Sequence, residues 1–221
     1  LCRRKNICFI VDAAQGAGLL PLKVGDGINI ICTAGHKGLY GPMGTGLMLT
    51  DGKYPLRTII EGGTGSMSES LEQPDFLPDR FESGTINTPG AIVLGAGVDF
   101  VKQRTAERIL AHETALCSSF CSALRRIPEI TVYSDIDEQP EAYAPVVSFS
   151  IDGIPSAEAA SRFSKLGFYM RGGLHCAPLA HKKLGTLENG TVRFAPSVFT
   201  TADDVSRLVW AINRKKWREQ V

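Results

Sequence analysis

Two apolar runs near the N-terminus set the narrowest limit on the fold. They read ICFIVDA (residues 7–13) and INIICTA (residues 28–34), and GTGLMLT (residues 44–50) is a third candidate strand. Nearly continuous apolar runs of strand length are typical of strands that are buried on both faces of a sheet. The N-terminal part therefore predicts an open α/β sheet with both faces covered.

The first two runs each end at residues that could carry chemistry. Asp12 closes the first run, and the His36-Lys37 pair follows the second. Ligands of open α/β sheets collect at the carboxyl ends of the strands, so these side chains could meet in space. By itself Lys37 is most simply a surface charge. However, glycines on both sides let backbone approach a bulky ligand, and an amine in a partly apolar pocket suits Schiff-base chemistry.

Asp12 has two interpretations. As a strand-end aspartate it caps the following turn, and as a buried carboxylate it needs a partner. That partner could be the ring nitrogen of a cofactor, which a carboxylate keeps protonated in pyridoxal phosphate sites. Gln15, three residues further on, could donate a hydrogen bond to the same ligand.

A cysteine lies in a glycine-containing and basic segment, MRGGLHCAPLAHKKLG (residues 170–185). A lone cysteine is usually a small core residue. Around Cys176, however, Arg171, His175, His181 and Lys182 make the segment electropositive, which favours the thiolate. His175 could equally be an ordinary exposed histidine.

Arg193 lies in the segment GTVRFAPS, between apolar residues, as though a strand carried it. An arginine in a strand more often faces solvent. If Arg193 points into a cleft instead, its planar guanidinium suits a substrate carboxylate.

The rest of the chain predicts a second domain of α+β character. Residues 54–88 have the composition of a loop, and a helical pattern then runs from Gly90 towards Ile127 with a break near Thr105. Strands are expected near residues 130–133, 146–151, 168–171 and 191–195, with a helix near 156–166 and a closing helix from Thr201, where Asp204 completes a capping box. We expect one domain over residues 1–103 and another over 104–221.

Composition narrows the class of function. The net charge is +1 at pH 7, which gives no reason to expect nucleic acid or an anionic membrane as partner. No apolar run is long enough to span a membrane, and the N-terminal residues lack a signal-peptide pattern, so a soluble protein of the cytoplasm is expected. The six cysteines are too sparse for a disulfide scaffold. We interpret Cys117 and Cys121 as small core residues, with metal binding as the alternative.

Five segments in order resemble one enzyme family over nearly the whole chain. They are FIVDAAQGAG, TAGHKGLYGPMGTG, RFESGTINTPG, RGGLHCAPLA and VRFAPSVFTTADDV. They are similar to the class V aminotransferase-like, pyridoxal phosphate-dependent cysteine desulfurases, with their selenocysteine lyase-like members. The resemblance implies a fold type I transferase: the later part of the large α/β domain, followed by the smaller C-terminal domain. Leu1 in place of a methionine also indicates part of a longer protein.

The resemblance implies a role for each candidate residue at the cofactor. Lys37 would be the Schiff-base lysine, Asp12 the partner of the pyridine nitrogen, and Gln15 a donor to the phenolic oxygen. His36 would lie beside the phosphate. Thr85 would reach the phosphate of the other subunit, which implies a homodimer.

The resemblance also implies the reaction. Arg193, with Arg171, would bind the carboxylate of L-cysteine, and the Cys176 thiolate would attack the substrate sulfur, leaving an enzyme persulfide and L-alanine. The short interval between Cys176 and Arg193 is similar to that of members that pass sulfur to an acceptor protein. The alternatives are another class V enzyme, such as an aminotransferase or a selenocysteine lyase, and an inactive fragment that lacks the N-terminal half.

Three features depart from the family pattern. Ala34 stands where a serine or threonine commonly binds the phosphate, with Thr33 one position earlier. Gly172 follows Arg171 where a residue with a side chain is more usual. The earlier half of the family's chain, with its phosphate loop and its ring-stacking residue, has no counterpart here.

Overall fold

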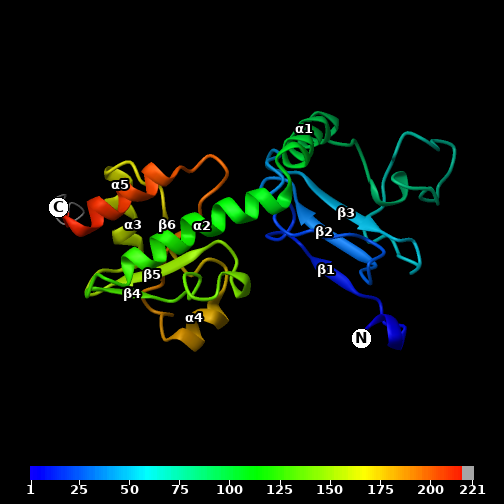
Figure 1. Cartoon of the computed structure of the whole chain (residues 1–221). Helices are drawn as coiled ribbons and strands as arrows, with labels where there is room; N and C mark the ends of the chain where they lie inside the picture. Colours follow the sequence, from blue (N-terminus) through cyan, green and yellow to red (C-terminus); the bar gives the residue numbers. More distant parts are fainter. Residues whose placement is uncertain (216–221) are drawn as a thin grey trace. The chain divides into compact units, whose positions relative to one another are not determined.

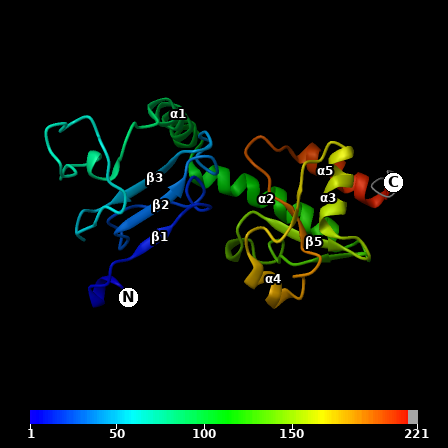
Figure 2. The ribbon, with the colours of Figure 1, turned by 180° about the vertical axis from the view of Figure 1, so that it is seen from behind.

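The computed structural model describes residues 1–215, which divide into two compact units (Figures 1 and 2). The first unit is Leu1–Glu107 and the second begins at Arg108. Each unit has its own sheet, of three strands in the first and four in the second. The assignment of residues 1–103 and 104–221 to the two domains of the family stays a proposal.

The sheet of the first unit brings two strand ends to one edge. Its order is β1-β2-β3, from β1 (Ile10–Asp12), β2 (Ile30–Ala34) and β3 (Gly46–Thr50). β1 runs parallel to β2, with Asp12 opposite Cys32, whereas β3 runs antiparallel to β2. The three expected strands are present, and the carboxyl ends of β1 and β2 lie side by side.

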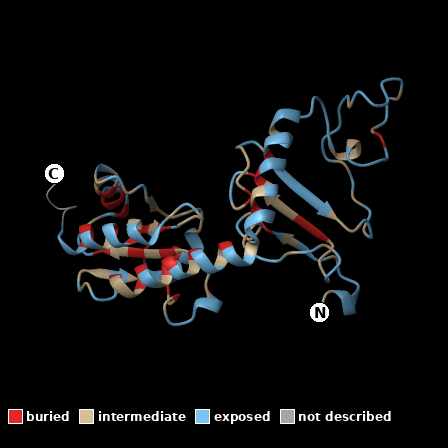
Figure 3. Cartoon of the chain, turned by 45° about the horizontal axis from the view of Figure 1, so that its top comes forward, coloured by how far each residue is buried: buried red, intermediate tan, exposed pale blue. Residues whose placement is uncertain are grey.

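The expectation that these strands are covered on both faces is wrong for this chain. Ile30 and Ile31 in the central strand are 3% exposed, but Ile10 in β1 is 56% exposed and Leu49 in β3 is 47% exposed. Figure 3 shows the exposed residues of this sheet in pale blue. The reason is that α1 (Thr88–Arg104) packs on the turn after β2, so the outer strands stay accessible.

The predicted break in the long helical segment is confirmed. α1 ends at Arg104 and α2 (Ala106–Leu124) begins after Thr105, whose φ is 65°. With ψ of 138° as well, Thr105 lies outside the helical region, so the helix stops there. At the other end of α1 the side chain of Asn87 accepts a hydrogen bond from the backbone N–H of Gly90 at 3.1 Å, which caps the helix.

The segment between β3 and α1 is irregular apart from the short 3₁₀ helix η2 (Asp79–Phe81), as its composition predicts. It exposes large apolar side chains, with Ile59 97% and Ile60 73% exposed. A second 3₁₀ turn, η1 (Arg3–Lys5), precedes β1.

The sheet of the second unit is antiparallel throughout. Its order is β4-β5-β7-β6, from β4 (Ile130–Val132), β5 (Val147–Ile151), β7 (Thr191–Phe194) and β6 (Arg171–Gly173). The strand expected over residues 168–171 begins instead at 171, because the preceding residues pack against the core without pairing.

The glycine at position 172 is explained by close packing of backbone. A Cβ atom at this position would lie 2.2 Å from the backbone oxygen of Ser156, the first residue of α3 (Ser156–Lys165). No side chain fits so close to backbone, so the glycine lets β6 lie directly against the start of α3. The departure from the family pattern at this position therefore reflects packing.

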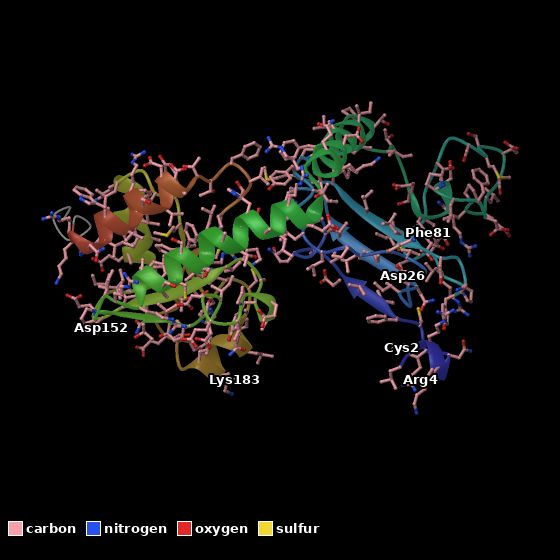
Figure 4. The ribbon with its side chains drawn as sticks, viewed as in Figure 1. Cys2, Arg4, Asp26, Phe81, Asp152 and Lys183 are labelled. Carbon is pink, nitrogen blue, oxygen red and sulfur yellow. The ribbon has the colours of Figure 1, made fainter. Side chains whose placement is uncertain are left out.

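The helices of the second unit cover its sheet and include one that the sequence did not predict. α4 (Pro178–Leu184) follows Cys176, and Lys183, labelled in Figure 4, marks it. α5 (Ala202–Asn213) begins at the expected capping box of Thr201 and Asp204, and η3 (Pro140–Ala142) is a further 3₁₀ turn. None of the described helices is long and apolar enough to cross a membrane.

The second unit has a contiguous core. Phe120, Phe149 and Phe163 are fully buried, and every other residue of β5 is buried, as expected for a strand with one face on the core. Cys117 and Cys121 are also fully buried, which confirms their interpretation as core residues. Burial raises the pKa of the Cys117 thiol. Burial, and to a smaller extent the hydrogen bond and charge of the Asp137 carboxylate, raises the pKa of the Cys121 thiol to about 11.

Candidate functional site

In the first unit, the parallel strands bring four predicted residues to one edge. Asp12 is the last residue of β1, and His36 and Lys37 follow the end of β2 by two and three residues. Gln15 lies in the turn after β1. All four side chains are exposed at the carboxyl ends of adjacent strands, which is the edge where ligands of α/β sheets bind.

The carboxylate of Asp12 caps the turn that carries Gln15. Its Oδ1 accepts a hydrogen bond from the backbone N–H of Ala14 at 2.9 Å. The capping interpretation is therefore correct for one carboxylate oxygen. A carboxylate has about four lone-pair positions, so this bond leaves it able to accept from a second donor.

Glycines lock the Lys37 turn against the turn after β1. A Cβ on Gly38 would lie 2.2 Å from the backbone oxygen of Ala17, and one on Gly18 would lie 2.0 Å from that of Gly38. The sequence suggested that glycines admit a bulky ligand. At these two positions they admit another stretch of backbone instead, which holds the Lys37 and Gln15 turns together.

The Lys37 turn is also fixed on α1. The backbone N–H of Gly41 donates to the oxygen of Gly35 at 2.8 Å, which closes the turn. The Tyr40 ring lies edge-on to that of Phe100 in α1, with centroids 5.2 Å apart. These contacts hold the turn from within the unit, so a site built on it would be preformed.

Thr33 does not replace the missing hydroxyl at position 34. Its Oγ1 donates to the backbone oxygen of Ala13 at 3.2 Å, which ties β2 to the turn after β1. Thr85 lies in the exposed segment that leads into α1. Thr85 therefore belongs to a different segment of the first unit from the four residues at the sheet edge.

In the second unit, two arginines stand directly opposite each other on neighbouring strands. Arg171 of β6 and Arg193 of β7 are paired in the antiparallel register, so both side chains leave the same face of the sheet. Like charges in such a position destabilise a sheet. A pair of this kind becomes favourable when an anion such as a carboxylate lies between the guanidinium groups.

Cys176 lies on a tight turn at the far end of β6. The backbone N–H of Ala177 donates to the oxygen of Leu174 at 2.8 Å, and the two central residues, His175 and Cys176, have φ of 52° and 62°. Cys176 is exposed on this turn. Its thiol is therefore accessible, unlike those of Cys117 and Cys121.

His175 is held as a neutral ring. Burial lowers the pKa of His175, its bond to the Thr191 backbone raises it, and the charges of Arg193, His181 and Arg171 lower it, with a net decrease. His175 therefore does not contribute to the positive charge expected around Cys176 at neutral pH.

Apart from Thr85, the predicted residues thus fall into two groups, one in each unit. The first unit holds Lys37, Asp12, Gln15 and His36, and the second holds Cys176, Arg171 and Arg193. The sequence analysis missed the part played by Thr191 and by Gly190, whose missing Cβ allows contact with the backbone of Gly173. No signal in the sequence indicated this contact, because it depends on how β6 and β7 pair.

The residues of the first unit fit pyridoxal phosphate in their donor chemistry. They provide an amine for a covalent bond, a carboxylate for a protonated ring nitrogen, and an amide and an imidazole for hydrogen bonds. They project from two turns that glycines pack together, so the set is rigid.

Comparison with known proteins gives a consistent result. The model of the family "Aminotransferase class-V" matches residues 1–208. The chain is 31% identical to a probable cysteine desulfurase from Methanothermobacter thermautotrophicus, covering 90% of this chain and 51% of that protein. It is also 33% identical to a probable cysteine desulfurase from Vibrio cholerae, and this match covers 96% of this chain and 52% of that protein.

A solved structure is also similar. The apo structure of a cysteine desulfurase from Thermococcus onnurineus NA1 aligns with a TM-score of 0.82 at 30% identity, covering 96% of this chain and 53% of that one. The chain therefore spans about half the length of the relatives it matches, and it has the fold of that half.

Proposed function

The chain belongs to the class V aminotransferase family, and from this premise we propose that it is part of a pyridoxal phosphate-dependent cysteine desulfurase. The relatives named above carry that name. The observation in this chain that carries the proposal is the exposed Cys176 on the turn after β6, the strand on which Arg171 faces Arg193 of β7. An aminotransferase has no use for such a thiol.

The residues at the sheet edge of the first unit would hold the cofactor. Lys37 would bind it covalently, Asp12 would keep its ring nitrogen protonated, and Gln15 and His36 would donate to its oxygens. When bound, pyridoxal phosphate supplies an electron sink for charge that develops at the α-carbon of an amino acid. Lys37, whose side chain is exposed, would take the α-proton once its amine is free.

The residues of the second unit would act on the substrate. Arg171 and Arg193 would bind the carboxylate of L-cysteine through their paired guanidinium groups. The Cys176 thiolate would attack the substrate sulfur, so that a sulfur–sulfur bond forms while the Cβ–S bond breaks. The electron pair of the broken bond stays on the substrate carbon, which takes a proton and leaves as L-alanine.

The assembly is part of the proposal. Thr85 and the exposed apolar side chains of residues 54–88, including Ile59 and Ile60, would lie at the interface of a homodimer. The persulfide on an exposed Cys176 would pass to the thiol of an acceptor protein. A cytoplasmic location stays a prediction of the sequence.

The test combines two substitutions in the purified protein. In Cys176→Ala, sulfide release from L-cysteine should fall to background while the visible absorbance of the bound cofactor remains. In Lys37→Ala, that absorbance should disappear. Matched controls are Cys8→Ala and Lys23→Ala, which remove a half-buried cysteine and an exposed lysine away from both groups.

Each alternative has its own outcome. Sulfide release that survives Cys176→Ala would contradict the desulfurase and favour another class V enzyme. Faster turnover of L-selenocysteine, with L-cysteine inert, would favour a selenocysteine lyase. A protein without visible absorbance after incubation with pyridoxal phosphate would favour an inactive fragment.

A further inference from the structure

The turn that carries Cys176 has a conformation that its sequence does not favour. Positive φ at both central residues is the pattern of a type I′ turn, in which glycine, asparagine and aspartate dominate. Here the two residues are His175 and Cys176, with φ of 52° and 62°. Residues with side chains rarely adopt this region unless the surroundings hold them there.

One side-chain bond links this turn to β7. The imidazole Nε2 of His175 lies 2.9 Å from the backbone oxygen of Thr191, the first residue of β7. A carbonyl oxygen accepts, so Nε2 carries the proton and donates. β7 is also the strand that carries Arg193, so this bond connects the thiol turn to the strand that would bind the substrate carboxylate.

The other nitrogen of the ring is buried without a partner. Nδ1 of His175 has no hydrogen bond among the described residues. As an unprotonated acceptor it costs less there than a buried N–H would, which again favours the neutral ring. The His175 ring also lies 5.9 Å, centroid to centroid, from the ring of His181 in α4. His181 is buried, and its Nδ1 is hydrogen-bonded to Thr186 Oγ1 at 2.8 Å.

We propose that His175 is a positioning residue for Cys176: its ring fixes the left-handed turn by donating from Nε2 to Thr191, and so sets where the thiol lies relative to β7. This deepens the desulfurase function and rests on it for its catalytic consequence. The bond itself is a property of the folded unit and can be tested without any reaction. A sulfur nucleophile displaced by about 1 Å can lose a hundredfold in rate, so a fixed turn matters.

Two substitutions of His175 by residues with amide side chains separate the contribution of the ring from that of the backbone. The amide nitrogen of glutamine reaches the position of Nε2, whereas the shorter asparagine ends near Nδ1. Asparagine tolerates positive φ better than most residues. If backbone strain alone mattered, His175→Asn would be the milder change, and if the bond to Thr191 matters, His175→Gln would be.

The first measurement is hydrogen exchange at the Ala177 amide, whose bond to Leu174 closes the turn. We expect exchange about tenfold faster in His175→Asn and within about threefold of the parent protein in His175→Gln, a tenfold change being about 1.4 kcal/mol. The control is His112→Asn, which removes a comparable bond from a ring nitrogen to the backbone oxygen of Thr200, at 2.9 Å, and should leave Ala177 unchanged. Unchanged exchange in His175→Asn, or equal acceleration in both amides, would overturn the proposal.

The second measurement is the kinetics of sulfide release. Because Cys176 acts after L-cysteine has bound, His175→Asn should lower kcat about tenfold or more with KM nearly unchanged, and His175→Gln should recover most of kcat. Faster exchange with unaltered kcat would show a structural role only and would also overturn the proposal. If no variant, the parent included, releases sulfide, the desulfurase function fails, while the exchange results still decide whether the ring holds the turn.

Discussion

The two turns that carry the proposed chemistry are held in opposite ways. The Lys37 turn is fixed by the absence of side chains, since Gly18 and Gly38 let two backbone segments touch. The Cys176 turn is fixed by the presence of a side chain, since the His175 ring holds two residues that disfavour the conformation of the turn. Added atoms should therefore damage the first turn, and removed atoms the second.

The largest expected effect is at Gly38. In Gly38→Ala the new Cβ would lie 2.2 Å from the backbone oxygen of Ala17. The Ala17–Gly18 backbone already contacts Gly38 closely, so it cannot move aside without disrupting the turn. We expect the free energy of unfolding to fall by about 3 kcal/mol. Urea unfolding followed by circular dichroism measures it. Gly63→Ala, where nothing lies within 4 Å, is the control. An equal loss in both variants would mean that close packing does not hold the Lys37 turn.

A pair of glycines in α1 sharpens the comparison within one helix. A Cβ on Gly97 would lie 2.3 Å from the backbone oxygen of Leu39, next to the Lys37 turn, whereas one on Gly95 meets nothing within 4 Å. Gly97→Ala should cost about 2 kcal/mol. Gly95→Ala should stabilise the protein by up to about 1 kcal/mol, because alanine favours a helix. Thermal unfolding of the two variants compares them, and the same sign of change in both would contradict this account.

The second unit offers a test of side-chain bonding outside the site. Asp137 accepts hydrogen bonds from the Cys121 thiol at 3.1 Å and from Arg125 Nε at 3.0 Å. Asp137→Ala leaves both donors without this acceptor and should cost about 1–2 kcal/mol. The measurement is the free energy of unfolding at pH 7, with Glu138→Ala, an exposed neighbour, as control.

The same carboxylate predicts a pH dependence. Burial raises the pKa of Asp137, but the bonds from Cys121 and Arg125 outweigh it, so the pKa is lowered overall. A lowered pKa in the folded state means that the stabilisation is complete above the unfolded pKa, about 4, and is lost as pH falls through the folded value. The difference between the parent protein and Asp137→Ala should therefore shrink in acid. A difference that grows below pH 4 would contradict this.

The smallest expected effect is at the arginine pair. Arg171→Gln removes one of two like charges that face each other across β6 and β7, so the free protein should become about 0.5 kcal/mol more stable at low salt. The same change should raise KM for L-cysteine, because half of the proposed carboxylate site is lost. Arg126→Gln, at an exposed arginine after α2, is the control for the loss of an arginine. A variant that is less stable and binds substrate as well as before would contradict the anion site.

The sequence predicted most elements because their signals are local. The strand runs, the capping box at Thr201 and the break at Thr105 depend on residues within one or two turns of chain, and all three are present. The extent of burial was predicted less well, because it depends on what covers a strand. The apolar run before Asp12 is the example, since Ile10 is 56% exposed.

The residues alone specified the kinds of chemical group, with the amine of Lys37 and the carboxylate of Asp12 at strand ends and the thiol of Cys176 in a basic loop. The tertiary structure alone decided what holds these groups, because that depends on contacts between distant segments. Gly38 contacts Ala17, Gly172 contacts Ser156, and the His175 ring reaches Thr191. A residue type fixes which bonds a side chain can make, and only the fold brings the partner within reach.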